Sequence, residues 1–215
     1  GNPATRRIDL MGTDEIVAAI NHEDMKVARA VKKALPEIAR AVDLIAGAFF
    51  KGRRLAYFGA GTSGRLGVLD AAECMPTFSV PDTMVQAFIA GGNAALRHAV
   101  ENAEDSRKKA LADINAFSPL PDDVVVGISA SGNPAYVLTV LEEARCRGAN
   151  TVGITCNPEA KLKPLCDVCI TAPVGPEVIA GSSRMKAGTA QKMILNMLST
   201  ASMIKIGKTY GNYMI

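Results

Sequence analysis

Short runs of apolar residues recur along the chain, and several of them end in glycine or serine. The runs are continuous and do not alternate with polar residues, which is typical of strands buried on both faces of a parallel sheet. Strands are predicted at residues 54–58, 84–89, 123–128, 151–155 and 168–171.

The segments between these runs space their apolar residues by three or four positions, as amphipathic helices do. Before the first strand, one such stripe runs from Val27 to Phe49, and Pro36 inside it predicts a kink or a break. Helices are predicted at residues 13–20, 22–49, 63–73, 94–112, 136–147 and 183–206.

Strand–helix repeats with short turns predict an α/β fold: a doubly wound, mainly parallel five-stranded sheet flanked by helices. The length of 215 residues suits one domain with a full core and a short extension. We expect an N-terminal helical arm over residues 1–39 and a single domain over residues 40–215.

Charge and composition narrow the class of protein. The net charge of +3, without a long basic run, and the absence of Trp disfavour a nucleic-acid partner. No apolar window reaches the roughly 18 residues of a membrane span, and the start Gly1–Ala4 does not resemble a secretory signal. Five cysteines beside apolar runs indicate reduced thiols and a cytoplasmic location.

Two predicted strands end in loops of glycine and small hydroxyl residues, Gly59–Gly64 and Ser129–Gly132. Ligands of open α/β sheets bind at the carboxyl ends of the strands, where helix N-termini attract anions. Glycine lets the backbone approach closely, and hydroxyls donate hydrogen bonds. The two loops favour an anion such as phosphate, while the alternative is that they hold only turn residues.

The sequence gives little support for a bound cofactor. The first loop matches G-x-G-x-x-G, but the second strand ends without the acidic residue that holds a ribose, which argues against NAD. No Walker-type phosphate loop is present. Cys166 and Cys169 form a lone C-x-x-C, and zinc would need two further ligands, whereas the histidines, His22 and His98, are distant in sequence. We expect neither a cofactor nor a metal.

Longer stretches resemble one family. Residues Gly59–Phe78 and Gly181–Lys192 resemble the signatures of N-acetylmuramic acid 6-phosphate etherases, with shorter matches at 102–106 and 207–212. The second loop is also similar to the Ser-x-Ser-Gly-x-Thr loop of sugar-isomerase (SIS) domains.

The chain departs from the family in three positions: Asn93 stands where Glu is frequent, Asn133 where Arg is usual, and Pro134 where Thr is usual. Members usually continue as a small helical C-terminal region, which we expect to be absent here.

The resemblance implies a carbon–oxygen lyase of peptidoglycan recycling. Such an enzyme removes D-lactate from the C3 oxygen of N-acetylmuramic acid 6-phosphate and adds water, giving N-acetylglucosamine 6-phosphate. The resemblance also implies a sugar-phosphate ligand, no metal, and a cytoplasmic homodimer with its sites at the subunit interface.

Carried over to this sequence, Glu73 is the acid that protonates the departing lactate oxygen, and Glu104 is the base that takes the C2 proton. Two carboxylates in different environments can divide these roles. Glu73 ends an apolar helix, so we expect its side chain to be partly buried and its pKa to be raised. The neighbours of Glu104, without the resemblance, predict a solvent-exposed helix residue. The residues expected to bind substrate are Gly61, Thr62, Ser63, Ser129, Ser131, Gly132, Asn133, Glu177, Ser182, Ser183 and Lys186.

Two of these assignments carry a spatial expectation. Ten helical residues separate Ser63 from Glu73, roughly 15 Å, and the distance from phosphate to C3 in a hexose phosphate is on the order of half that. Glu73 is therefore expected to serve a site completed by a second subunit. Lys186 is a candidate to pair with the phosphate or the lactate carboxylate, or else a solvated lysine at a helix start.

The residues alone leave two other functions possible. An aldose–ketose isomerase would share the fold and phosphate site and need a base near C2. A non-catalytic sugar-phosphate sensor, similar to the glucokinase regulatory protein, would bind without turnover and would not need the two carboxylates.

Overall fold

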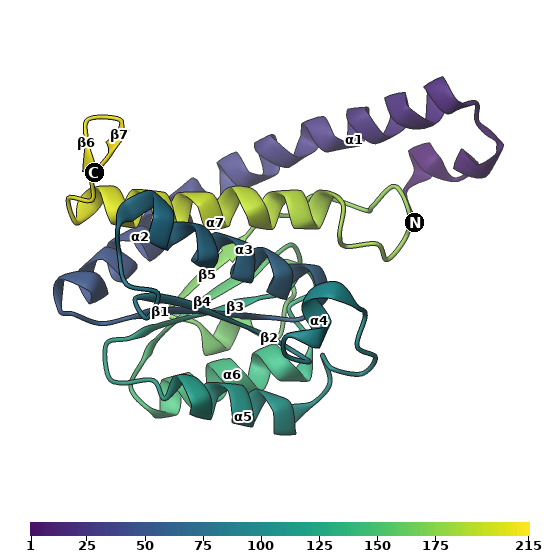
Figure 1. Ribbon diagram of the computed structural model, residues 1–215. Coiled ribbons are helices and arrows are strands. Elements are labelled where there is room, and N and C mark those ends of the chain that lie inside the picture. The colour runs from purple at the N-terminus through teal and green to yellow at the C-terminus, as the bar shows by residue number, and fades with distance from the viewer.

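The computed structural model describes residues 1–215 and is built around one five-stranded sheet (Figure 1). All neighbouring strands are parallel, in the order β2-β1-β3-β4-β5, which confirms the predicted parallel sheet. The strands are β1 (Leu55–Gly59), β2 (Val85–Ile89), β3 (Val124–Ile128), β4 (Asn150–Thr155) and β5 (Val168–Thr171).

Helices cover both faces of the sheet (Figure 1). On one face lie α2 (Leu35–Phe50), α3 (Gly61–Phe78) and α7 (Lys186–Lys205), with α1 (Thr13–Lys33) packed along α7. On the other face lie α5 (Arg107–Phe117) and α6 (Ala135–Cys146), with the short α4 (Ala94–Arg97) near the sheet edge. The remaining elements are 3-10 turns at Pro3–Thr5, Ile8–Leu10 and Lys163–Leu165 and a terminal hairpin, β6 (Thr209–Tyr210) with β7 (Tyr213–Met214).

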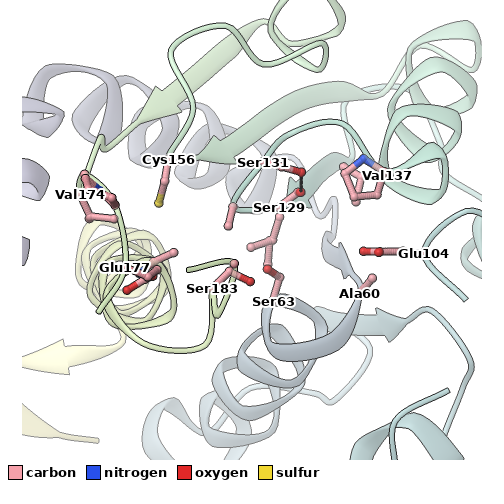
Figure 2. Close-up of a pocket in the computed structure, with 17 residues that line it drawn as sticks. Ala60, Ser63, Glu104, Ser129, Ser131, Val137, Cys156, Val174, Glu177 and Ser183 are labelled. Carbon is pink, nitrogen blue, oxygen red and sulfur yellow. Dashed lines mark hydrogen bonds between the residues drawn. The ribbon is translucent and has the colours of Figure 1, made fainter. Parts of the chain in front are cut away.

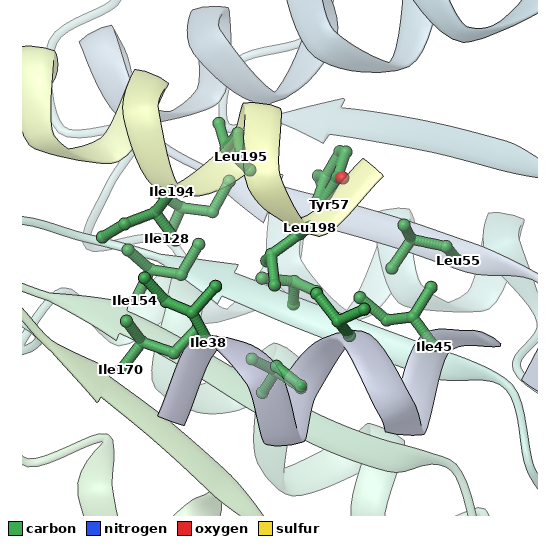
Figure 3. Close-up of a cluster of buried hydrophobic side chains, with 14 of the residues drawn as sticks. Ile38, Ile45, Leu55, Tyr57, Ile128, Ile154, Ile170, Ile194, Leu195 and Leu198 are labelled. Atoms are coloured by element: carbon green, nitrogen blue, oxygen red, sulfur yellow. The ribbon is translucent and has the colours of Figure 1, made fainter. Parts of the chain in front are cut away.

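A hydrophobic core fills each interface between the sheet and a helical layer. The larger core joins Ile38 and Ile45 of α2 and Leu198 of α7 to the strands, where Ile128 and Ile154 point at them (Figure 3). Each fully buried side chain of this kind contributes about 1.5–3 kcal/mol relative to an exposed one. The continuous apolar strands are therefore explained, because both of their faces are covered.

The strand order creates a crevice between β1 and β3. From β1 the chain crosses to β2 on one side, and from β3 it continues to β4 and β5 on the other. The loops that leave the carboxyl ends of β1 and β3 therefore diverge, and this switch point is where such sheets bind ligands.

Several predicted helix boundaries are wrong. The segment predicted as one helix over 94–112 contains α4, an irregular stretch from 98 to 106, and α5. Asn102 adopts a left-handed conformation, with φ of 56°, and the Ser106 side chain accepts a hydrogen bond from the Lys109 amide, which starts a new helix.

Toward the N-terminus, α1 runs without the break predicted near residue 21, and α3 continues to Phe78, beyond the predicted end at residue 73. The break expected near Pro36 lies at Ala34, because Pro36 occupies the first turn of α2, where a missing N–H costs nothing. The division expected between residues 39 and 40 lies inside α2 and stays a prediction.

The helical arm is mainly α1, which extends past the sheet along α7 (Figure 1). Its buried apolar residues, Val27, Ala30 and Val31, belong to the larger core. No helix of the chain combines the length and the hydropathy that a membrane crossing requires.

The end of β1 and the first turn of α3 touch backbone to backbone. A Cβ atom added at Gly64 would lie 2.6 Å from the Gly59 carbonyl oxygen and 2.6 Å from Cγ1 of Ile89. Only glycine allows the first turn of α3 to approach the strand this closely.

We expect Gly64→Ala to lower the free energy of unfolding by about 1–3 kcal/mol, because the methyl group overpacks a backbone contact. Gly47→Ala in α2 is the matched control: an added Cβ there meets no atom within 4 Å. It should raise stability by about 0.5–1 kcal/mol, since alanine favours helix interiors. Urea denaturation measures both, and an equal effect of the two substitutions would contradict the close contact.

Candidate functional site

A pocket of about 400 Å³ lies at the carboxyl ends of β1 and β3 (Figure 2). Seventeen residues line it, most of them from the two glycine–serine loops and the segment before α7, with Glu104 from the 98–106 stretch. The predicted site residues among them are Ser63, Glu104, Ser129, Ser131, Glu177 and Ser183.

Ser63 lies in the first turn of α3, on the wall of the pocket. Its side chain is nearly buried, and its Oγ donates a hydrogen bond to Oε1 of Gln191 on α7, at 2.9 Å. The two helices can approach here because α7 presents Gly188, whose added Cβ would lie 3.3 Å from the Thr62 methyl group.

The second loop curls so that its hydroxyls face the same space. Ser129 Oγ accepts a hydrogen bond from the Gly132 amide at 3.0 Å and lies 3.5 Å from Ser131 Oγ. Gly132 has a φ of 69°, and a Cβ there would lie 2.4 Å from the Ala160 Cβ, so the turn requires glycine. Pro134 follows, immediately before α6, and also lines the pocket.

Glu177 lies opposite Glu104 across the pocket and caps the N-terminus of α7 (Figure 2). Its two carboxylate oxygens accept hydrogen bonds from the Lys186 amide, at 3.0 Å, and the Ala187 amide, at 2.9 Å. The positive end of the helix dipole stabilises such a carboxylate. The pocket wall before α7 is therefore held by this cap.

Lys186 is not a solvated lysine, contrary to one of the two expectations for it. Its side chain is 1% exposed, and its Nζ lies 2.5 Å from Oε2 of Glu23, which is 2% exposed and belongs to α1. Lys186 does not line the pocket; its ammonium joins the arm to the start of α7.

The environment of Glu23 favours its charged form. Burial alone would raise the pKa of Glu23, but hydrogen bonds from Lys186 and Lys26 lower it to about 2. The carboxylate thus stays ionised and paired wherever the protein is folded near neutral pH.

Glu104 lies in the irregular 98–106 stretch, not on a solvated helix as its neighbours alone suggested. The Tyr136 amide of α6 donates to the Glu104 carbonyl oxygen at 2.9 Å, which ties this stretch to the first turn of α6. The Glu104 side chain also borders a second pocket of about 290 Å³, together with Gly61 and Arg65. Folding thus brings Glu104 close to the two serine loops, although it lies about forty positions after Ser63 in the sequence.

Glu73 lies elsewhere. It is exposed on α3 and lines neither pocket, so the expected partial burial is wrong. A groove of about 530 Å³ between α3 and β2 is lined by Val68, Ala71, Ala72 and Met75 among others, but not by Glu73. Because α3 continues past Glu73, the separation from Ser63 along the helix is the full ten residues.

The other predicted residues lie around the rim. Thr62 borders a shallow groove with Arg184 and Lys192, while Ser182 lines no described pocket. The Asn133 side chain accepts a hydrogen bond from the Lys161 amide at 3.1 Å and so ties two loops together. The substrate-binding roles of all these residues stay predictions.

Several lining residues were not predicted: Ala60, Cys156, Val174, Gly175, Pro176 and Ala187. Cys156 directly follows β4, so the rule that ligands bind at strand ends would have found it. The segment 174–176 has no such signal, because its place depends on the packing of α7.

Comparison with known proteins decides the family. The chain is 56% identical to an N-acetylmuramic acid 6-phosphate etherase of Pasteurella multocida, over 100% of this chain and 71% of that protein. It is 54% identical to one of Vibrio vulnificus, with the same coverage. The chain belongs to the N-acetylmuramic acid 6-phosphate etherase family.

Two family models show that the chain contains a SIS domain. Residues 37–145 match the glucokinase regulatory protein N-terminal SIS domain, and residues 97–201 match the SIS domain. The solved phosphoheptose isomerases of Francisella tularensis and Neisseria gonorrhoeae superpose with TM-scores of 0.69 and 0.68. Both are 18% identical and cover 89% of this chain and 98% of theirs, which shows a shared SIS-type fold.

We expect Lys186→Met to lower the free energy of unfolding by about 3–5 kcal/mol, because it leaves the Glu23 carboxylate buried without its partner. The double variant Glu23→Gln, Lys186→Met should regain most of that loss, since no buried charge remains. Lys192→Met, a partly exposed lysine of the same helix, is the control. Urea denaturation of the wild type and the three variants measures these changes; a double variant as unstable as Lys186→Met would contradict the pairing.

The pair also predicts a pH dependence. The folded pKa of Glu23, about 2, lies below the unfolded value of about 4.5, so the unfolded state binds more protons between these values. The stability that this carboxylate contributes is complete above about pH 4.5 and is lost as the pH falls toward 2. Glu23→Gln should therefore flatten the acid limb of the stability curve, and an unchanged slope would contradict the lowered pKa.

Proposed function

We propose that this protein is a carbon–oxygen lyase that cleaves the lactyl ether of N-acetylmuramic acid 6-phosphate. The products are D-lactate and N-acetylglucosamine 6-phosphate. The observation that carries the proposal is the 52–56% identity to proteins named N-acetylmuramic acid 6-phosphate etherase over the whole chain. The proposed setting is peptidoglycan recycling in the bacterial cytoplasm.

The phosphate is proposed to bind between the two serine loops. Ser63, Ser129 and Ser131 supply hydroxyls to one pocket, and α3 directs the N–H groups of its first turn toward it. An anion at this point is stabilised by the helix dipole and by charge-assisted hydrogen bonds.

Glu104 is proposed as the base. It borders the pocket that holds the serines, within the reach of a sugar whose phosphate they bind. In the open-chain sugar the C2 proton is α to the aldehyde: Glu104 takes this proton, a C2–C3 double bond forms, and the C3–oxygen bond breaks. The lactate oxygen takes a proton from the acid, Glu73. Water then adds across the double bond, with Glu104 assisting.

The acid is proposed to come from a second copy of the chain. Glu73 does not line the pocket of its own chain, whereas Leu69, one helical turn before Glu73, is 44% exposed and gives this face of α3 an apolar side chain. A second copy packed on the exposed face of α3 would bring Glu73 to the pocket of the partner subunit. Such a two-fold contact would form two complete sites in a homodimer.

Named relatives favour the lyase over the isomerase and the sensor. An isomerase needs one base near C2 but no acid at a lactyl ether, and a sensor needs neither carboxylate. Relatives that are 52–56% identical over the whole chain are named etherases, whereas the phosphoheptose isomerases share the fold at 18% identity.

Release of D-lactate from N-acetylmuramic acid 6-phosphate tests the activity. We expect lactate from the wild type and a rate lower by about 10²–10⁴ in Glu104→Gln, the contribution usual for a positioned general base. Asp105→Asn, an exposed neighbour that lines no described pocket, should retain the wild-type rate. No lactate from the wild type, with the sugar phosphate still bound, would favour a sensor instead.

Mixed dimers test the shared site. Refolding Glu73→Gln with Glu104→Gln chains should restore about a quarter of the wild-type activity, because half of the dimers then have one complete site. Each variant alone should be inactive. If both carboxylates acted from the same chain, every site would lack one of them, and mixing would restore nothing.

A further inference from the structure

Gln191 has an unsatisfied donor beside the proposed phosphate site. Its side chain is 1% exposed, and its Oε1 accepts the hydrogen bond of Ser63 Oγ at 2.9 Å. Its Nε2 is buried and has no hydrogen-bond partner. Buried polar groups are almost always paired, and an unpaired N–H is less tolerated than an unpaired carbonyl.

The direction of this hydrogen bond matters for an anion. A serine hydroxyl has a single hydrogen to donate. With that hydrogen directed at Gln191, Ser63 presents only lone pairs to the pocket, and these repel phosphate oxygens. The hydroxyl hydrogen of Ser63, which is expected to bind the phosphate, therefore points away from the pocket while the pocket is empty.

A half-turn of the amide reverses the arrangement. Nε2 then donates to Ser63 Oγ, and the hydroxyl hydrogen becomes free to donate into the pocket. Oε1 takes the unpaired position, which is the less costly of the two groups to leave there. No backbone movement is needed, because both side chains already lie between α3 and α7.

We propose that Gln191 is a positioning residue that turns the Ser63 hydroxyl toward the phosphate of the bound sugar. The amide accepts from Ser63 in the empty pocket and donates to it when an anion is bound. The inference rests on the proposed function only in that the ligand is a sugar phosphate.

Calorimetric binding of N-acetylglucosamine 6-phosphate to the full chain tests this. Gln191→Glu should weaken binding at least about 10-fold, because a carboxylate can only accept from Ser63 and keeps the hydroxyl turned away. Gln191→Met should weaken it about 3–10-fold while leaving the melting temperature unchanged or higher, since an unsatisfied buried donor is removed. Asn196→Met, an exposed amide of the same helix, should change neither.

The Ser63→Ala background separates positioning from a general structural effect. There, Gln191→Met should cause no further loss of affinity, since the hydroxyl that it orients is gone. Affinity for unphosphorylated N-acetylglucosamine should be the same in wild type and Gln191→Met. An equal loss in both backgrounds, an equal loss for the unphosphorylated sugar, or no loss at all would overturn the inference.

Failure of the lyase proposal is distinguishable from failure of this one. A wild type that binds the sugar phosphate but releases no lactate overturns the proposed activity, and the binding cycle still reports on Gln191. A wild type whose sugar binding does not depend on the phosphate overturns the role of Gln191, whatever the activity.

Discussion

The close contact between β1 and α3 is the constraint on which the site depends. Gly59 and Gly64 allow the strand to turn directly into the helix, so that the first turn of α3 opens at the β1/β3 switch point. A longer connection would displace the helix N-terminus from the anion that it attracts. The same helix then carries Ser63 at its start and Glu73 on its outer surface, and its rigidity fixes how far apart these two side chains must be.

The middle of this helix is held by a buried polar cluster. Asp70 accepts hydrogen bonds from Tyr57 Oη at 2.9 Å and Ser199 Oγ at 3.1 Å, which join α3 to β1 and α7. Burial raises the pKa of Asp70 to about 6, although both hydrogen bonds lower it. Together with the Glu23–Lys186 pair, this cluster fixes α7 against its neighbours. The pocket wall that begins α7 is thus positioned by charged and polar groups that never meet the ligand.

The sequence was most informative where one physical rule acts locally. Continuous apolar runs predicted the strands, and glycine–serine strand ends predicted the pocket, because burial and the carboxyl-end rule depend on short segments. Residues 98–106 were predicted as part of a helix, because their apolar spacing suits one, but they form an irregular stretch. The helix cap Ser106 was the signal that a new helix begins there. The burial of Lys186 could not be predicted, because its partner Glu23 lies 163 positions away. Pairings at such separations depend on tertiary packing, which periodicity does not describe.

The positions of the two glutamates follow from different kinds of element. Glu104 lies in an irregular stretch whose backbone is tied to α6, so its carboxylate can border the pocket of its own chain. Glu73 lies on a regular helix, where the direction of every side chain is set by the helical repeat and cannot be adjusted toward the pocket. Glu73 is exposed in the single chain, as are the apolar side chains of Leu69, one helical turn before it, and Ala72. Covering that apolar surface with a second α3 would bury hydrophobic area and bring the carboxylate to a sugar in one step, so the same contact would stabilise the dimer and complete the site.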